Sequence, residues 1–218
     1  MFLFSNYYYY RYPQFIWAQE INKIFKSDII SNLHDRDIID APCGDGIISF
    51  WIKKNYKNNI SLYDIDKTRI LIAQKNIKDT AIFEENIFKM NLKTKNNIWL
   101  FINSLYCMQD KQDLLKNMSA QIEYIIAVFP YINHINYKTF VQQNPSFINH
   151  SEMNKDQTIN FFKEFHYEMV FNKDVTFIPF YKKSIPYFKS LINIFNILFD
   201  RFNKNKSGAY WIGVFKKY

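Results

Sequence analysis

The chain of 218 residues is poor in glycine, cysteine and histidine, with 4, 2 and 4 of each. So few glycines argue against an all-β protein built on many tight turns. Two cysteines are too few for a disulfide framework and form no CxxC pair, so we expect no metal site and a reducing, cytoplasmic compartment. No stretch reaches the ~18 uninterrupted apolar residues of a membrane span, and the aromatic N-terminus lacks the basic region of a signal peptide. We therefore expect no transmembrane segment.

The formal net charge of +8 and the sequence pI of about 9.2 favour anionic partners. However, the lysines are scattered, and the chain is rich in the residues of A/T-rich codons: Lys, Asn, Ile, Phe and Tyr. A biased genome gives this composition whatever the function. Nucleic acid is therefore an alternative partner that the sequence does not favour over a small molecule, and the oligomeric state is not predicted.

Short apolar runs alternate with helical patterns along most of the chain. We expect strands at residues 37–41, 60–63, 80–83, 98–102, 124–129, 168–178 and 208–215. We expect helices at residues 13–25, 47–54, 67–77, 110–120, 157–166 and 186–202. This order predicts an α/β fold: a doubly wound, mostly parallel seven-stranded sheet with helices on both faces and an antiparallel C-terminal strand.

The chain shows no repeat and no linker, so we predict one domain over residues 1–218. Residues 1–34 are expected to form an N-terminal helical cap, and residues 131–205 to form lid or cap insertions. Within the insertions, residues 131–156 are polar and have few strand signals, which is typical of a functional loop. The helix at 186–202 is apolar over most of its circumference, so it is either a cap on the sheet or a substrate lid or interface.

The most informative segment is the loop after the first predicted strand. It contains two glycines, Gly44 and Gly46, and Asp40 stands at the end of the strand. Glycine lets the backbone adopt positive φ and pass close to a ligand. Open α/β sheets bind ligands at the carboxyl ends of their strands. We therefore predict that this loop binds a nucleotide-like cofactor.

Two cofactor classes share this layout. For the dinucleotide class, Ser49 stands where the third residue of GxGxxG falls, and Asp64 follows at the distance of the ribose-binding acid. Against it, three residues separate Asp40 from the first glycine, and an acid there repels a pyrophosphate but not a sulfonium amino acid. The loop therefore favours a sulfonium cofactor over NAD.

The segment Asp40-Ala41-Pro42-Cys43-Gly44-Asp45-Gly46 resembles the first motif of the class I (Rossmann-like) S-adenosylmethionine-dependent methyltransferases, commonly written D/E-x-G-x-G-x-G. Pro42 replaces its first glycine, a variant also found in that family. Residues 61–67 resemble the second motif, residues 83–87 the segment after the third strand, and residues 100–106 the fourth strand and its turn. The resemblance covers residues 35–130 well and the rest only by topology.

The resemblance implies S-adenosylmethionine as cofactor and a set of residues that bind it. By this implication Asp64 holds the ribose hydroxyls, Asn86 and Ile87 face the adenine, and Asp40 serves the amino-acid end through water or backbone. The full implied set is Asp40, Ala41, Pro42, Gly44, Gly46, Asp64, Ile65, Asn86, Ile87 and Asn103. The glycines are expected to make room for the cofactor. Asp66 better fits the N-cap of the following helix.

The acceptor side is less well defined. His134 is a candidate general base and Tyr106 a candidate acceptor-side residue, although a loop histidine is more often solvated and a tyrosine more often packed. The Asn/Asp-Pro-Pro-Tyr/Phe motif of amino-group methyltransferases is absent after the fourth strand. The sequence predicts an enzyme that methylates an O or N atom of a small metabolite, such as a sugar or secondary metabolite. The alternatives are an inactive methyltransferase-like binding protein and an RNA-associated methyltransferase.

Overall fold

A seven-stranded sheet forms the centre of the computed structural model, which describes residues 8–89, 97–105, 108, 110–132, 153–175 and 210–218. The strands are β1 (Ile38–Asp40), β2 (Ile60–Asp64), β3 (Ala81–Glu84), β4 (Asn97–Ile102), β5 (Ile122–Pro130), β6 (Tyr167–Val175) and β7 (Tyr210–Lys217). Their order is β3-β2-β1-β4-β5-β7-β6. Strands β1 to β5 are parallel, and β7 runs antiparallel to both of its neighbours. The predicted fold class is confirmed.

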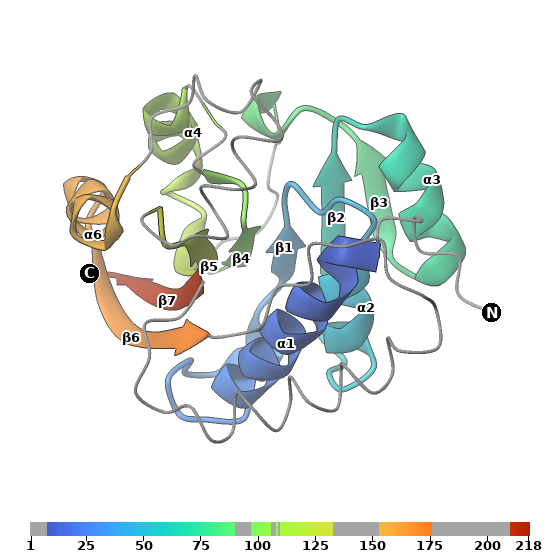
Figure 1. Cartoon of the computed structure of the whole chain (residues 1–218), viewed down its shortest axis with the longest axis horizontal. Helices are drawn as coiled ribbons and strands as arrows, with labels where there is room; N and C mark the ends of the chain where they lie inside the picture. The colour runs from blue at the N-terminus through green and yellow to red at the C-terminus, as the bar shows by residue number, and fades with distance from the viewer. Residues whose placement is uncertain (1–7, 90–96, 106–107, 109, 133–152, 176–209) are drawn as a thin grey trace.

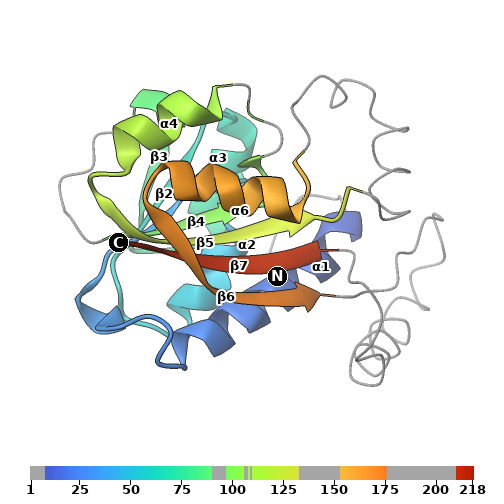
Figure 2. The same ribbon diagram turned by 90° about the vertical axis from the view of Figure 1, so that its left-hand side faces the viewer.

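Helices cover both faces of this sheet because side chains alternate between the faces along each strand. The described helices are α1 (Tyr8–Phe25), α2 (Ile47–Lys53), α3 (Lys67–Asn76), α4 (Lys111–Met118) and α6 (Lys155–Glu164). Helices α1, α2 and α3 share one buried cluster with Ile38 and Leu100, whereas α4 and α6 share another with Ile39 and Trp99. Figure 1 shows α1 lying across the sheet, and Figure 2 shows α4 and α6 on the side opposite α1.

The first helix begins at Tyr8, five residues before the predicted start at Pro13. The prediction was wrong because it assigned the proline to the first turn, where its missing N–H is not needed. Pro13 lies in the second turn instead, where it forgoes one hydrogen bond. The packing of Trp17, Ile21 and Ile24, each at most 2% exposed, fixes the helix on the sheet.

Helix α6 begins at Lys155, two residues before its predicted start at residue 157. Its N-cap is Asn154, whose side chain accepts from the Gln157 N–H, while the Gln157 side chain accepts from the Asn154 N–H. This reciprocal pair is a capping box. Residues 153–175 of the range predicted as lid or cap thus form α6, which packs against the sheet, and β6, which is its edge strand. The rest of that range, including the predicted helix at 186–202, lies almost entirely outside the described residues.

The strand order of the sheet also distinguishes between the two cofactor classes that the sequence analysis compared. The dinucleotide-binding fold continues its parallel order to a sixth parallel strand beside the fifth. Here the antiparallel β7 lies between β5 and β6. This architecture differs from the dinucleotide-binding one.

Candidate cofactor-binding site

The predicted cofactor residues gather at the carboxyl ends of the neighbouring strands β1, β2 and β4. The loop from Ala41 to Gly46 connects β1 to α2 and is held from both sides. The Cys43 N–H donates to the carbonyl of Tyr63 on β2, at 2.9 Å. On the other side the Ala41 carbonyl accepts from the Trp99 indole N–H on β4, at 2.8 Å. The half-buried Pro42 follows a cis peptide bond. The loop is thus anchored before any ligand binds.

Gly44 and Gly46 are glycines for different physical reasons. Both have positive φ, 57° at Gly44 and 74° at Gly46. A Cβ built on Gly44 would make an ordinary van der Waals contact with Arg69 Nη1, at 3.6 Å, and would meet no other atom within 4 Å. A Cβ on Gly46 would lie 2.8 Å from Ile77 Cδ1 and 2.9 Å from Leu62 Cδ2. The expectation that Gly46 makes room for the cofactor is therefore corrected: its missing side chain makes room for the packing of β2 against the Ile77 end of α3.

Asp64, at the end of β2, ties the loop to the next strand. One carboxylate oxygen, Oδ2, accepts from the Gly44 N–H at 2.7 Å, and the other, Oδ1, accepts from the Asp66 N–H at 2.9 Å. The residue is 5% exposed. An ionised carboxylate has about four acceptor positions. One position therefore stays open on each oxygen, which suits a vicinal diol.

The structure settles the register of the two acids after the second strand. β2 ends at Asp64, and Asp66 is the N-cap of α3, accepting from the N–H groups of Thr68 and Arg69 at 2.9 and 3.3 Å. Asp66 also pairs with Arg69 at 3.4 Å. The predicted N-cap is confirmed. Both oxygens of Asp66 are thus engaged, one by the helix N-terminus and the other by Arg69.

Asp40 lies at the end of β1 on the same sheet face as Asp64. It pairs in register with Leu62, two residues before Asp64. It is 1% exposed, and its Oδ2 accepts from the Ser49 hydroxyl of α2 at 2.7 Å. Burial raises the pKa of Asp40 to about 7, which the Ser49 hydrogen bond opposes and the carboxylates of Asp64 and Asp45 reinforce. Asp40 is therefore a buried carboxyl held by Ser49 and not a surface contact.

The residues predicted for the adenine, Asn86 and Ile87, follow β3, and the predicted cofactor residue Ile65 follows β2. Ile65 is 71% exposed, unusually high for a large apolar side chain, and directly follows Asp64. Asn86 is half-buried, and its Oδ1 accepts from the Phe88 N–H at 3.0 Å, which caps the short helical turn Ile87–Lys89. Ile87 is buried below it. One acceptor position and the amide N–H₂ of Asn86 remain for a ligand.

The end of β4 carries two polar groups that lack partners. Asn103 has φ of 52°, and its backbone N–H donates to the Val128 carbonyl at 2.9 Å. Its Oδ1 and the Ser104 hydroxyl are both buried without a hydrogen-bond partner. Because buried polar atoms are nearly always paired, these two atoms have hydrogen-bonding capacity left for a ligand. The sequence analysis predicted Asn103 but missed Ser104, because a serine after a strand carries no distinctive signal.

The predicted catalytic residues, His134 and Tyr106, both lie outside the described residues. Within the described part of the chain, no group of three or more His, Cys, Asp or Glu side chains is arranged to hold a metal ion. No described helix is long and apolar enough to cross a membrane.

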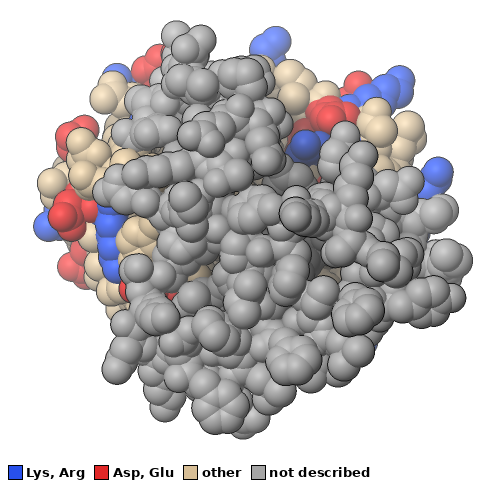
Figure 3. Space-filling view, in the orientation of Figure 1, with Lys and Arg blue, Asp and Glu red and all other residues tan. Residues whose placement is uncertain are grey.

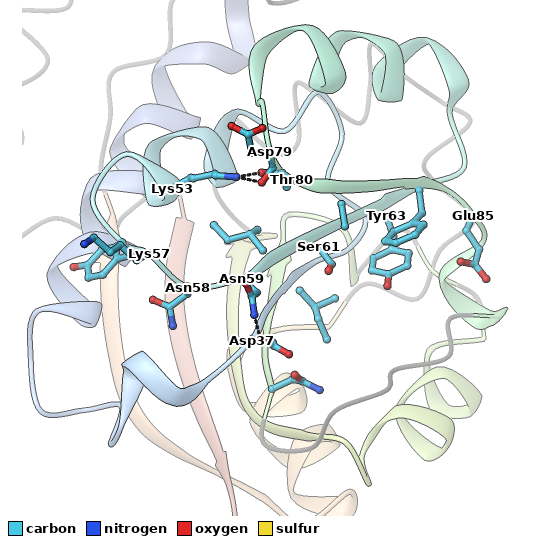
Figure 4. Close-up of a pocket in the computed structure, with 16 residues that line it drawn as sticks. Asp37, Lys53, Lys57, Asn58, Asn59, Ser61, Tyr63, Asp79, Thr80 and Glu85 are labelled. Carbon is cyan, nitrogen blue, oxygen red and sulfur yellow. Dashed lines mark hydrogen bonds between the residues drawn. The ribbon is translucent and has the colours of Figure 1, made fainter.

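A hollow of about 850 Å³ opens elsewhere, on the face of β1, β2 and β3 (Figure 4). The aromatic rings of Tyr63 and Phe83 stack at its edge with centroids 4.7 Å apart, and Lys53 and Asp37 lie around it. It is lined by none of the predicted cofactor residues. The site at the strand ends therefore rests on its hydrogen-bonding geometry and not on this hollow.

Comparison with known proteins gives a consistent result. Residues 23–99 match the methyltransferase small domain family. No curated protein matches the sequence. Among solved structures, the chain is similar to magnesium protoporphyrin IX methyltransferase of Synechocystis with bound S-adenosylhomocysteine (TM-score 0.64, 10% identity, covering 95% of this chain and 84% of that one).

Two further structures are similar over nearly their whole length. One is a S-adenosylmethionine-dependent methyltransferase of Archaeoglobus fulgidus (TM-score 0.62, 11% identity, 94% of each chain). Another is described as a possible histamine N-methyltransferase of Thermotoga maritima (TM-score 0.60, 11% identity, 94% of this chain and 93% of that one). At these identities the likeness shows the fold. The chain therefore has the fold of the class I, Rossmann-like methyltransferases, and its residues 23–99 match the methyltransferase small domain family.

Proposed function

We propose that the chain binds S-adenosylmethionine and transfers its methyl group to an O or N atom of a small metabolite. The observation that carries this proposal is the junction between Gly44 and Asp64. There the Gly44 N–H donates to the nearly buried Asp64 carboxylate at 2.7 Å, and a Cβ at Gly44 would meet only the end of the Arg69 side chain. The similarity to methyltransferases crystallised with S-adenosylhomocysteine or S-adenosylmethionine supports the choice of cofactor.

The described residues fit the parts of that cofactor. Asp64 offers one open acceptor position on each oxygen to the ribose hydroxyls. Ile65 offers an exposed apolar surface to one face of the adenine, and Asn86 with Ile87 borders its edge. Asn103 offers its unpartnered Oδ1 to the amino-acid end. Ala41 and Pro42 shape the loop, and Gly46 packs it against α3.

When bound, the cofactor supplies a methyl group on a sulfonium, which an O or N nucleophile attacks in line. The protein's own contribution is to hold both partners in the reactive geometry, which supplies much of the rate enhancement of such a transfer. A base assists when the nucleophile carries a proton. We retain His134 as the candidate base and Tyr106 as a candidate acceptor-side residue.

The same edge of the sheet carries a polar cluster on its far side, toward β6. The Tyr131 hydroxyl, just after β5, donates to the Asp174 carboxylate near the end of β6. Lys155 at the start of α6 lies 3.6 Å from Asp174 and donates to Asn172 at 2.9 Å. β5 and β6 both end at the edge where the cofactor loop lies, so this cluster offers donors and acceptors to the acceptor molecule.

A small acceptor is favoured over nucleic acid by the charge distribution. Where described residues are visible in Figure 3, lysine and arginine side chains are mixed with acidic ones. A nucleic-acid interface is expected to gather positive charge on one face.

The test is methyl transfer from methyl-labelled S-adenosylmethionine to a fractionated extract of the source cells, followed by mass spectrometry. We expect label in a small-molecule fraction and production of S-adenosylhomocysteine. Asp64→Ala should lower the transfer at limiting cofactor about ten- to a hundredfold, whereas Asp66→Ala should retain it. Label confined to RNA would overturn the small-metabolite acceptor, and cofactor binding without transfer to any fraction would show an inactive binding protein.

A further inference from the structure

The guanidinium of Arg69 lies against the cofactor loop, although Arg69 belongs to the first turn of α3. Its Nη1 is 3.6 Å from the position that a Cβ on Gly44 would take. Its Nε lies 3.4 Å from Asp66 Oδ2, in an ion pair between exposed side chains. The Gly44 N–H in turn donates to Asp64, the acid proposed to hold the ribose. Arg69, Gly44 and Asp64 therefore border the same site.

The head group of Arg69 has hydrogen-bonding capacity left for a ligand. Its contact with Asp66 is made through Nε. The N–H donors of its two Nη groups form no hydrogen bond with the described residues. The side chain is 61% exposed, so a ligand can reach it. A planar guanidinium with free donors is the group that proteins use to bind a carboxylate through two parallel hydrogen bonds.

The order of the strands gives a direction to a cofactor that binds at this edge of the sheet. Asn86 follows β3, and Asp64 ends the neighbouring strand β2. The Gly44 loop follows β1, and Asn103 follows β4. With the adenine beside Asn86 and the ribose on Asp64, the amino-acid end of the cofactor extends past Gly44 toward β4. The Arg69 head group lies along that path.

The amino-acid end of the cofactor carries an ammonium and a carboxylate, which need different neighbours. The ammonium suits the acids of the site, because Asp40 and Asp64 end neighbouring strands on the same face of the sheet. The same acids repel the ligand's carboxylate. A carboxylate that leaves water needs donors or an opposite charge. Arg69 is a cation that the structure places against this loop, with donors to offer.

We propose that Arg69 binds the α-carboxylate of the cofactor through its Nη groups, and that it thereby selects ligands with an amino-acid end over simpler nucleosides. This inference rests on the proposed function. It applies equally to S-adenosylmethionine and S-adenosylhomocysteine, because both carry the same carboxylate. Solvent screens an exposed side chain, so the contact strengthens binding by about tenfold rather than by the larger factor of a buried pair.

The controls separate this contact from a general effect of charge or folding. Lys67→Gln removes another exposed cation from the same turn of α3 and should leave the preference for the carboxylate unchanged. Arg69→Lys keeps the charge without the planar fork and should retain only part of the preference. Because Arg69 is exposed, Arg69→Gln should keep its Tm within about 2 °C of the wild type.

The test compares S-adenosylhomocysteine with its decarboxylated analogue, which keeps the adenine, ribose, sulfide and amine. Calorimetry gives both dissociation constants for each protein. We expect the wild type to bind the analogue about tenfold more weakly, and Arg69→Gln to bind the two ligands within about twofold of each other. A preference that survives in Arg69→Gln, or that Lys67→Gln removes equally, would overturn the inference and leave the proposed function intact. If the wild type binds neither ligand, the proposed function fails, and this inference fails with it.

Discussion

Gly46→Val is expected to destabilise the protein by about 3 kcal/mol or more, enough to leave it largely unfolded if its stability is ordinary. A Cβ at this position would lie 2.8 Å from Ile77 Cδ1, 2.9 Å from Leu62 Cδ2 and 3.1 Å from the Ala73 Cβ. Leu62, Ala73 and Ile77 are all buried, at most 5% exposed, so their methyl groups can move aside only by repacking the layer between β2 and α3. The φ of 74° adds strain for a β-branched residue.

The control is the same loop's other glycine. The added Cβ in Gly44→Ala makes only an ordinary contact with Arg69 Nη1 at 3.6 Å, so this variant should cost about 1–2 kcal/mol for its positive φ alone. Thermal unfolding of both variants by circular dichroism makes the comparison. We expect a folded Gly44→Ala with weakened cofactor binding and an unfolded or strongly destabilised Gly46→Val. If Gly46→Val has a wild-type Tm and loses only ligand binding, the loop has a different packing from the one described.

Asp64→Ala is expected to weaken cofactor affinity by about ten- to a hundredfold, or about 1.4–2.8 kcal/mol. The lost carboxylate would have accepted two ribose hydroxyls, and charged hydrogen bonds contribute about 1.5–3 kcal/mol each. The structure adds a second consequence. The variant also leaves the N–H groups of Gly44 and Asp66 without their acceptor, so about 2 kcal/mol or more of stability should be lost as well.

Asp66→Ala is the matched control because it removes the same group two residues further on. Its carboxylate caps α3, so its loss should cost about 1 kcal/mol of stability and leave affinity nearly unchanged. Dissociation constants measured by equilibrium dialysis, together with denaturant unfolding of each variant, separate the two effects. If Asp66→Ala proves to be the variant that loses affinity, the ribose-binding acid is Asp66 and the assignment of Asp64 is wrong.

Much of the architecture followed from local pattern. Each predicted strand has its counterpart, because buried strands give short apolar runs bounded by turn residues. The N-cap role of Asp66, just beyond the end of β2, was also predictable. Two acids two residues apart point the same way only within a strand, so one of them had to lie beyond its end.

Other features depend on contacts that a sequence does not display. The role of Gly46 is set by Leu62 and Ile77, which are 16 and 31 residues away in the chain. The raised pKa of Asp40 comes from burial at the junction of β1 with β2 and α2, and an isolated aspartate carries no sign of it. The start of α1 at Tyr8 is set by packing further along the helix, which outweighs the proline.

The central claim is that the Gly44–Asp64 junction binds the cofactor of a methyltransferase and not a dinucleotide. Isothermal titration calorimetry of the purified protein with S-adenosylhomocysteine, and separately with NAD, tests it most directly. We expect saturable heat with S-adenosylhomocysteine and none with NAD. The affinity for S-adenosylhomocysteine should be at least tenfold weaker in Asp64→Ala. Saturable heat with NAD and none with S-adenosylhomocysteine would contradict it.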